Sequence, residues 1–266
     1  MVRGWKRLFL SILSAVVVNL VVAFSVQAET VGVAVASNFK TTAEALSRSF
    51  SAKSGHDVVL SSGSTGKLYT QIKNGAPFEV FLAADSLRAA LSEKNGLAVT
   101  GSRFTYARGR IALWSRMPDL AGLGPDYLKG NTVTRLAIAN PKTAPYGQAA
   151  IEMLKKLKLY EVVKHKIVQG ENIAQTYQFA YSRNAEVGVV ALSQLVHPEK
   201  EGSDQDGKLD EFTWVVPEHL HQPIDQQAVL LVKGQDNPAA TAFIGYLKSD
   251  EAAAIIQSFG YATVKP

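Results

Sequence analysis

The feature that most restricts the fold is a regular alternation of short apolar runs with helical patterns along most of the chain. Several of these runs are apolar at nearly every position, which is typical of strands covered on both faces in a parallel sheet. Between them, side chains such as Phe39, Ala43, Leu46 and Phe50 recur at helical spacing. The alternation predicts an α/β fold with right-handed crossovers. The predicted strands cover residues 31–36, 58–60, 80–84, 111–114, 136–139, 187–192 and 228–232.

Two longer extended segments indicate that the chain crosses twice between two lobes. The first covers residues 104–115, contains several aromatic and β-branched side chains, and has Gly109 in its middle. The second covers residues 222–233. Two such crossings would insert a middle lobe into a lobe built from both ends of the chain. The last predicted helix runs over residues 238–259 and ends at Gly260, a residue type common just past helix ends.

The first 28 residues have the pattern of a secretory signal peptide. Three basic residues precede a largely apolar stretch at 8–24, and small residues occupy the positions that a signal peptidase reads before Ala28. The alternative is an uncleaved membrane anchor, but the stretch is short for a bilayer span and contains Asn19. We therefore expect a periplasmic protein, exported and cleaved after Ala28.

Charge and cysteine content exclude several classes of function. The whole chain has a net charge of +5, with 28 basic and 23 acidic residues. Residues 1–28 hold three of the basic residues and no acidic ones, so the mature chain keeps 25 basic residues and a net charge of +2. No basic stripe marks a nucleic-acid surface. The chain has no cysteine, which excludes disulfides, thiol chemistry and cysteine metal sites.

A repeated local design points to a binding site. Four times, a strand or extended run ends in small polar residues and a helix is predicted to begin at once. In a parallel α/β sheet such junctions lie together at the carboxyl ends of the strands, where ligands bind. The junction residues are Ser37 with Asn38, the loop 63–66 with Ser64 and Thr65, Pro145-Tyr146-Gly147, and Glu171-Asn172-Ile173.

Helix starts of this kind suit a small anion. The first turn of a helix has N–H groups without intrahelical partners and a partial positive charge of about half a unit. Glycines allow close approach of the backbone, and hydroxyls add donors. The alternative for each junction is simple helix capping, for which Ser37, Asn38, Thr65 and Asn172 are good residues. Four junctions in one chain favour a site without naming its ligand.

Competing chemistries are weakly supported. The loop at Gly63 and Gly66 lacks the spacing of a nucleotide-binding P-loop, and Leu68 stands where that loop needs a hydroxyl. Ser64 lacks the preceding glycine of a serine hydrolase elbow. His219 and His221 are the only histidines close in sequence, and metal binding there would need further ligands. We expect no catalytic residues, and no metal other than one carried in an oxyanion.

Several motifs resemble the molybdate-binding periplasmic components of ABC transporters. They are "VAVASNF", "SSGSTGKLYTQIKNGAPFEVFLAAD", "GSRFTYARGRIALWS", "ANPKTAPYGQAA" and "ENIAQTYQFAYSRNAEVGVVALSQL", in family order over residues 29–266. The resemblance implies a two-lobed periplasmic binding protein of type II, with a mostly parallel sheet flanked by helices in each lobe and the ligand cleft between them. Lobe 1 would comprise residues 29–108 and 225–266, and lobe 2 residues 109–224. It also implies a monomer that delivers its ligand to an inner-membrane ABC permease.

The resemblance implies a tetrahedral molybdate or tungstate dianion held by hydroxyls and amides without counter-charges. The residues carried over are Ser37, Asn38, Ser64, Thr65, Tyr146 and the backbone N–H of Ile173. Some family members place a tyrosine on a later strand instead, but that position here is Ala191, so Tyr146 is the expected hydroxyl donor. Lys67 is expected to face solvent.

A site that only donates hydrogen bonds prefers a fully deprotonated oxyanion, because a protonated one would leave its proton unpaired. Sulfate, thiosulfate or another small oxyanion also meets this condition, so a receptor for one of these is the first alternative. An exported enzyme acting on an acidic substrate is the second, although no nucleophile–base pair is visible. No cofactor is expected beyond the transported oxyanion.

Overall fold

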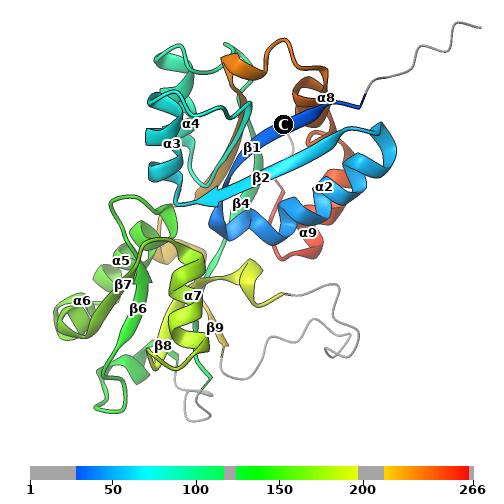
Figure 1. Cartoon of the computed structure of the whole chain (residues 1–266). Helices are drawn as coiled ribbons and strands as arrows, with labels where there is room; N and C mark the ends of the chain where they lie inside the picture. Colours follow the sequence, from blue (N-terminus) through cyan, green and yellow to red (C-terminus); the bar gives the residue numbers. More distant parts are fainter. Residues whose placement is uncertain (1–27, 117–123, 197–212, 264–266) are drawn as a thin grey trace, which may run out of the picture.

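The computed structural model describes residues 28–116, 124–196 and 213–263. The predicted signal peptide therefore lies outside the described residues, apart from Ala28. The described chain forms two lobes, each built on a five-stranded sheet (Figure 1). The sheet of lobe 1 has the order β2-β1-β3-β10-β4, and the sheet of lobe 2 has the order β7-β6-β8-β5-β9.

The strands of lobe 1 are β1 (Thr30–Ala36), β2 (Asp57–Gly63), β3 (Val80–Ala83), β4 (Phe104–Gly109) and β10 (Ile224–Leu230). Those of lobe 2 are β5 (Ile111–Trp114), β6 (Leu136–Ala139), β7 (Ile167–Gly170), β8 (Val187–Ala191) and β9 (Thr213–Val215). The predicted mostly parallel arrangement is confirmed, since one strand in each sheet runs against its neighbours: β10 in lobe 1 and β5 in lobe 2. Each of these strands follows directly after a crossing from the other lobe.

The helices of lobe 1 are α2 (Lys40–Ser54), α3 (Thr65–Lys73), α4 (Ser86–Lys94), α8 (Pro238–Tyr246) and α9 (Asp250–Ser258). Those of lobe 2 are α5 (Pro145–Lys156), α6 (Tyr160–Val163) and α7 (Ile173–Tyr181). Short 3₁₀ turns complete the path: η1 (Ser37–Phe39), η3 (Gly124–Lys129), η4 (Lys164–Lys166), η5 (Leu192–Gln194), η6 (Glu218–Leu220) and η7 (Val232–Gly234).

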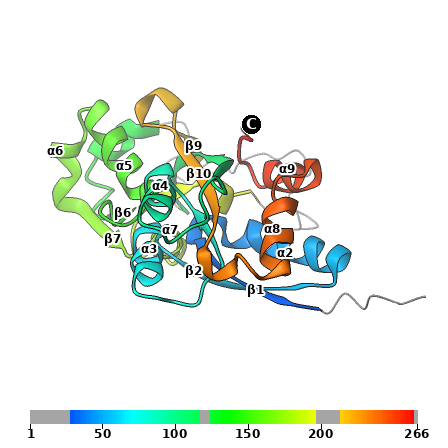
Figure 2. The same ribbon diagram turned by 90° about the horizontal axis from the view of Figure 1, so that it is seen from above.

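The lobe 1 sheet is covered on both faces, as its apolar strands predicted. Val31, Val33 and Val35 of β1 pack with α2, α8 and α9, whereas Ala34 points to the other face and packs with α3 and α4. Figure 2 shows the two helix groups on opposite sides of the sheet. Lobe 2 has its own core between its sheet and helices.

The extended segment at 104–115 does pass from one lobe to the other: it forms two strands in different sheets, β4 and β5, with Arg110 between them. One prediction about element boundaries needs correction. The single helix predicted over 238–259 is divided into α8 and α9, because the Ser249 side chain caps a new helix by accepting from the Ala252 N–H at 3.2 Å. The helical end at Gly260 has the predicted left-handed backbone, with φ of +78°.

The return crossing leads from β9 to β10, between Val215 and Ile224. The two crossings lie side by side, because β4 and β10 pair in the lobe 1 sheet. Within the described residues, no helix is long and apolar enough to cross a membrane.

Candidate functional site

All four predicted helix starts meet at one small cavity between the lobes, called here the inter-lobe cavity. It has a volume of about 10 Å³. Every predicted site residue lines it, and none of the described lining residues carries a charge. They are Ala36, Ser37, Asn38, Gly63, Ser64, Thr65 and Ala84 from lobe 1, and Ala144, Pro145, Tyr146 and Ile173 from lobe 2.

Ser64 is placed at the start of α3 but does not cap that helix. Its backbone is extended and its side chain makes no capping hydrogen bond. Its Oγ is buried and has no hydrogen-bond partner among the described residues. The capping alternative therefore does not explain this serine.

The next hydroxyl, that of Thr65, has a structural partner. Thr65 is fully buried, and its Oγ1 accepts from the backbone N–H of Ala84 at 3.1 Å. Ala84 follows the end of β3, so this bond holds the strand end against the α3 start. Two adjacent residues with similar side chains thus have different surroundings.

Ser37 and Asn38 form the 3₁₀ turn η1 that leads into α2. Ser37 lines the cavity, and the turn begins without a side-chain cap. The Asn38 amide reaches behind the cavity, where its Nδ2 donates to Gln226 Oε1 at 2.8 Å and to the Tyr261 hydroxyl at 3.1 Å. Tyr261 in turn donates to the Asn38 carbonyl at 2.8 Å. The side chain of Asn38 therefore fixes the turn that lines the cavity.

Tyr146 brings a hydroxyl from lobe 2 into the same region. It lies in the first turn of α5, which also starts without a side-chain cap, and it is 1% exposed. Burial, and next the neighbouring Tyr261 and Tyr106 hydroxyls, raise the pKa of Tyr146 well above its ordinary value. The phenol therefore keeps its proton at neutral pH and can act as a donor.

The fourth helix start is α7, and here the capping alternative is correct for one residue. The Asn172 side chain caps the helix by accepting from the Gln175 N–H at 3.0 Å. Ile173 is the first residue of α7 and lines the cavity. Its N–H belongs to the first turn, where no intrahelical acceptor is available.

The two lobes touch directly beside the cavity. The Gly66 N–H donates to the Thr143 carbonyl at 2.9 Å, and Arg88 Nη2 donates to the Lys142 carbonyl at 3.1 Å. Lys67 was expected to face solvent. Its side chain is half exposed, but it also forms an ion pair with Glu171 of lobe 2 at 2.9 Å.

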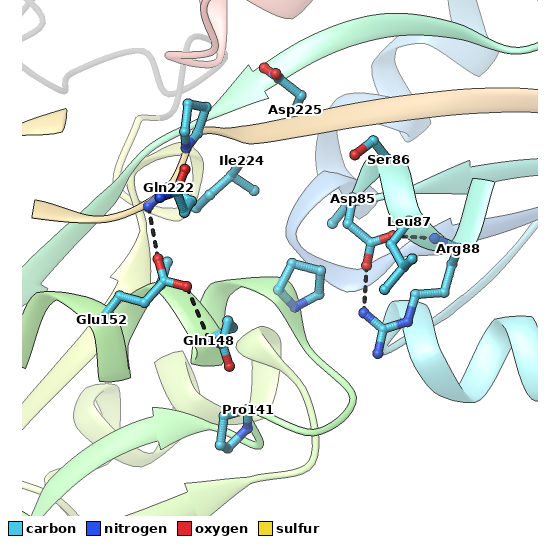
Figure 3. A pocket seen from close by; sticks show the side chains of 14 residues that line it. Asp85, Ser86, Leu87, Arg88, Pro141, Gln148, Glu152, Gln222, Ile224 and Asp225 are labelled. Atoms are coloured by element: carbon cyan, nitrogen blue, oxygen red, sulfur yellow. Dashed lines mark hydrogen bonds and ion pairs between the residues drawn. The ribbon is translucent and has the colours of Figure 1, made fainter. Parts of the chain in front are cut away.

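A larger groove lies beside the inter-lobe cavity, along α4, α5 and the start of β10 (Figure 3). Its volume is about 330 Å³. Its three acidic groups already have partners: Asp85 pairs with Arg88 at 2.8 Å, Asp225 pairs with Arg108 at 2.6 Å, and Glu152 accepts from the Gln222 N–H at 2.8 Å. Such carboxylates would repel an anion, so the smaller neutral cavity is the better anion site.

The histidine pair does not form a metal centre. His221 is buried and its Nδ1 lies 2.7 Å from the Gln222 carbonyl oxygen, while the His219 carbonyl accepts from Lys156. Within the part of the chain that the structure describes, no group of three or more His, Cys, Asp or Glu residues could hold a metal ion.

Sequence reasoning missed four residues behind the cavity: Tyr106, Gly109, Gln226 and Tyr261. Gly109, Gln226 and Tyr261 lie against the hydroxyl of Tyr146 or the amide of Asn38, and Tyr106 donates to Gln226 Oε1. The signals available for them were weak. Gly109 was singled out as the middle of a crossing, and Gln226 lies in the second predicted crossing, but neither pattern indicated contact with Tyr146.

Comparison with known families agrees with this geometry. The family model for bacterial extracellular solute-binding proteins matches residues 31–262. The chain belongs to this family. Among curated solute-binding proteins, it is 49% identical over 240 residues to the molybdate-binding protein ModA of Azotobacter vinelandii, covering 90% of this chain and 92% of that protein. It is 45% identical over 230 residues to ModA of Rhodobacter capsulatus, covering 86% and 87%.

The fold of this solute-binding protein also matches a solved structure. The periplasmic molybdate-binding protein of Azotobacter vinelandii superposes with a TM-score of 0.82 at 37% identity, over 88% of this chain and 99% of that chain. The predicted two-lobed binding-protein fold and the resemblance to molybdate-binding proteins are both confirmed. These relatives are named as binding proteins, not as enzymes.

Proposed function

We propose that this solute-binding protein captures molybdate or tungstate in the inter-lobe cavity and delivers it to an ABC permease. The observation that carries the proposal is the buried Ser64 hydroxyl, which lacks a partner among the described residues. A buried polar atom without a partner costs about 1–3 kcal/mol, so a ligand that accepts its proton removes that cost. The names of the relatives point to molybdate.

The chemistry of the cavity supports an oxyanion without a proton. Ser37, Ser64 and Tyr146 offer hydroxyl donors, and the starts of α3, α5 and α7 offer backbone N–H groups. No carboxylate among the described lining residues could accept a ligand proton. Hydrogen phosphate would leave its proton unpaired, whereas molybdate, tungstate and sulfate would not. Sulfate is therefore the competitor that experiment must separate.

Ligand entry requires the lobes to move. A cavity of about 10 Å³ has room for roughly one water molecule, which is less than a tetrahedral oxyanion needs. Rotation about the two adjacent crossings would open it, and closure would restore the contacts at Gly66 and Lys67. The surface formed by the closed lobes is then what the permease recognises.

Three further statements belong to this proposal. The protein is exported to the periplasm and cleaved after Ala28. It acts as a monomer, with no nucleic-acid partner. The lobes divide as predicted, into 29–108 with 225–266 and 109–224, except that Gly109 and Ile224 go with lobe 1 because they belong to β4 and β10. The family to which the chain belongs and the paired crossings support the first and third statements.

The deciding experiment is a titration of the exported protein with molybdate, tungstate, sulfate and phosphate. Calorimetry measures binding of each anion, and thermal unfolding measures the stabilisation that it causes. Ligand at 100 times its Kd adds about 2.7 kcal/mol to the free energy of unfolding. We expect stabilisation by micromolar molybdate or tungstate and none by phosphate. Stabilisation by sulfate alone would mean that the site is correct but that its ligand is sulfate. No response to any of the four anions would overturn the proposal.

A further inference from the structure

The hydroxyl of Tyr146 lies in a socket made by Asn38 and by two residues, Gly109 and Gln226, that sequence reasoning did not assign to the site. Asn38 Nδ2 and Gln226 Nε2 both donate to it, each at 3.3 Å. Gly109 forms the third wall, because a Cβ at that position would lie 2.1 Å from the hydroxyl oxygen. The socket thus combines one residue of lobe 1, both crossing segments and a tyrosine of lobe 2.

The orientation of the Gln226 amide is determined by its other partners. Gln226 is fully buried, and its Oε1 accepts from Asn38 Nδ2 at 2.8 Å and from the Tyr106 hydroxyl at 3.3 Å. With its oxygen turned to two donors, its Nε2 must point towards Tyr146. A flipped amide would place Nε2 against Asn38 Nδ2 and so face a donor with a donor.

This arrangement decides where the Tyr146 proton goes. A phenol has one proton to donate and lone pairs that accept. The two amide nitrogens within hydrogen-bond distance of the Tyr146 oxygen, Asn38 Nδ2 and Gln226 Nε2, can only donate to it. These amides therefore cannot accept the Tyr146 proton. The Tyr261 hydroxyl is a neighbouring acceptor behind the cavity, and an oxyanion in the cavity that Tyr146 lines would be a stronger acceptor because it is charged.

We propose that Gln226 is a positioning residue for oxyanion binding: it orients the Tyr146 hydroxyl so that this group donates its proton to the ligand. The inference rests on the proposed function, since it requires an anion in the cavity. Because Gln226 and Gly109 lie on the two crossings, lobe movement would assemble or loosen the socket. The Tyr146 donor is then correctly oriented only when the lobes are closed.

An experiment can distinguish a role of Gln226 in orienting Tyr146 from a role in general core packing. The test measures molybdate affinity by calorimetry for wild type, Gln226→Leu, Tyr146→Phe and the double variant. In the wild-type background, Gln226→Leu should weaken molybdate binding by about tenfold, the effect of one lost hydrogen bond. In the Tyr146→Phe background the same substitution should weaken it by less than about twofold, because the hydroxyl that it orients is gone.

Gln227→Leu is the matched control. Gln227 is the next residue on β10, and its side chain bonds to Arg103 and Thr105, away from Tyr146. It should leave molybdate affinity unchanged. Should Gln226→Leu not fold, judged by its thermal unfolding, Gln226→Met replaces it in the same four-variant comparison.

Each outcome has a distinct meaning. A large effect of Gln226→Leu that disappears in the Tyr146→Phe background supports the positioning role. Equal loss of affinity in both backgrounds, or no loss in either, overturns it while the proposed function stands. Wild-type protein that binds neither molybdate nor tungstate contradicts the proposed function itself.

Discussion

The Gly66 N–H of lobe 1 donates to the Thr143 carbonyl oxygen of lobe 2 at 2.9 Å, beside the inter-lobe cavity. The contact is so close that a Cβ on residue 66 would lie 3.1 Å from both the Thr143 Cα and the Thr143 carbonyl oxygen. Gly66 has no positive φ, so its role here is close approach and not an unusual backbone. A glycine at this position therefore permits the lobes to close fully.

Gly66→Ala should weaken oxyanion binding without destabilising the protein. The added methyl group opposes closure against Thr143, and we expect an affinity loss of about three- to tenfold, or roughly 1 kcal/mol. Alanine is favoured over glycine in a helix by about 1 kcal/mol, so α3 itself should not lose stability. Gly245→Ala is the control, because a Cβ there meets nothing within 4 Å. It should leave affinity unchanged, and equal affinity of Gly66→Ala and wild type would contradict the closure role.

Ser64 and Thr65 should respond oppositely to loss of their hydroxyls. Ser64→Ala removes a buried Oγ without a partner among the described residues, so it should reduce oxyanion affinity by about 1–3 kcal/mol and leave ligand-free stability unchanged or higher. Thr65→Val removes the acceptor of the Ala84 N–H and should lower ligand-free stability by about 1–3 kcal/mol. Urea unfolding of ligand-free protein and calorimetry give the two quantities. The assignment is wrong if Ser64→Ala binds as tightly as wild type.

The ion pair between Lys67 and Glu171 should matter little for binding. The two side chains are 51% and 66% exposed, and exposed pairs contribute about 0–1 kcal/mol. Lys67→Met should therefore weaken oxyanion binding by less than about fivefold in low salt. The difference from wild type should shrink as salt is added, because exposed charges are screened. A loss above a hundredfold that persists in high salt would mean that Lys67 contacts the anion directly.

Much of the architecture could be predicted from residue patterns, because β1 and β3 are apolar on both faces and the helices carry apolar stripes. The meeting of Ser37, Ser64, Tyr146 and Ile173 follows from the rule that strand ends gather at one edge of a sheet. The division between α8 and α9 also had a local signal, since Ser249 is followed by two acidic residues at a helix start.

The orientation of individual side chains could not be predicted in the same way. The Asn38 amide bonds to Gln226 and Tyr261, which are 188 and 223 residues away in sequence, so no local pattern could indicate its orientation. Capping propensity describes Ser64 and Thr65 almost equally, yet only tertiary contact with Ala84 separates their hydroxyls. Such differences depend on contacts between residues that are distant in sequence, and the local sequence does not predict those contacts.

The three buried tyrosines around Gln226 should make the protein sensitive to alkali. Burial raises the pKa of Tyr106 and Tyr146 well above the ordinary value of 10.0, and that of Tyr261 to about 12. Below pH 10 these phenols are protonated in both the folded and the unfolded chain, so their titration has no effect on stability. Above pH 10 the unfolded chain loses these protons first and is favoured, so the free energy of unfolding falls as pH rises towards the folded pKa values.

The expected slope is about 1.4 kcal/mol per pH unit for each tyrosine, or roughly 4 kcal/mol per unit for the three together. Urea unfolding at several pH values between 9 and about 12 measures it. Tyr106→Phe removes one titrating group, and its hydroxyl contacts only the Ala83 carbonyl and Gln226 Oε1 among the described residues. This variant should reduce the slope by about one third relative to wild type. An unchanged slope in Tyr106→Phe would show that alkaline unfolding is governed by groups other than the buried phenols.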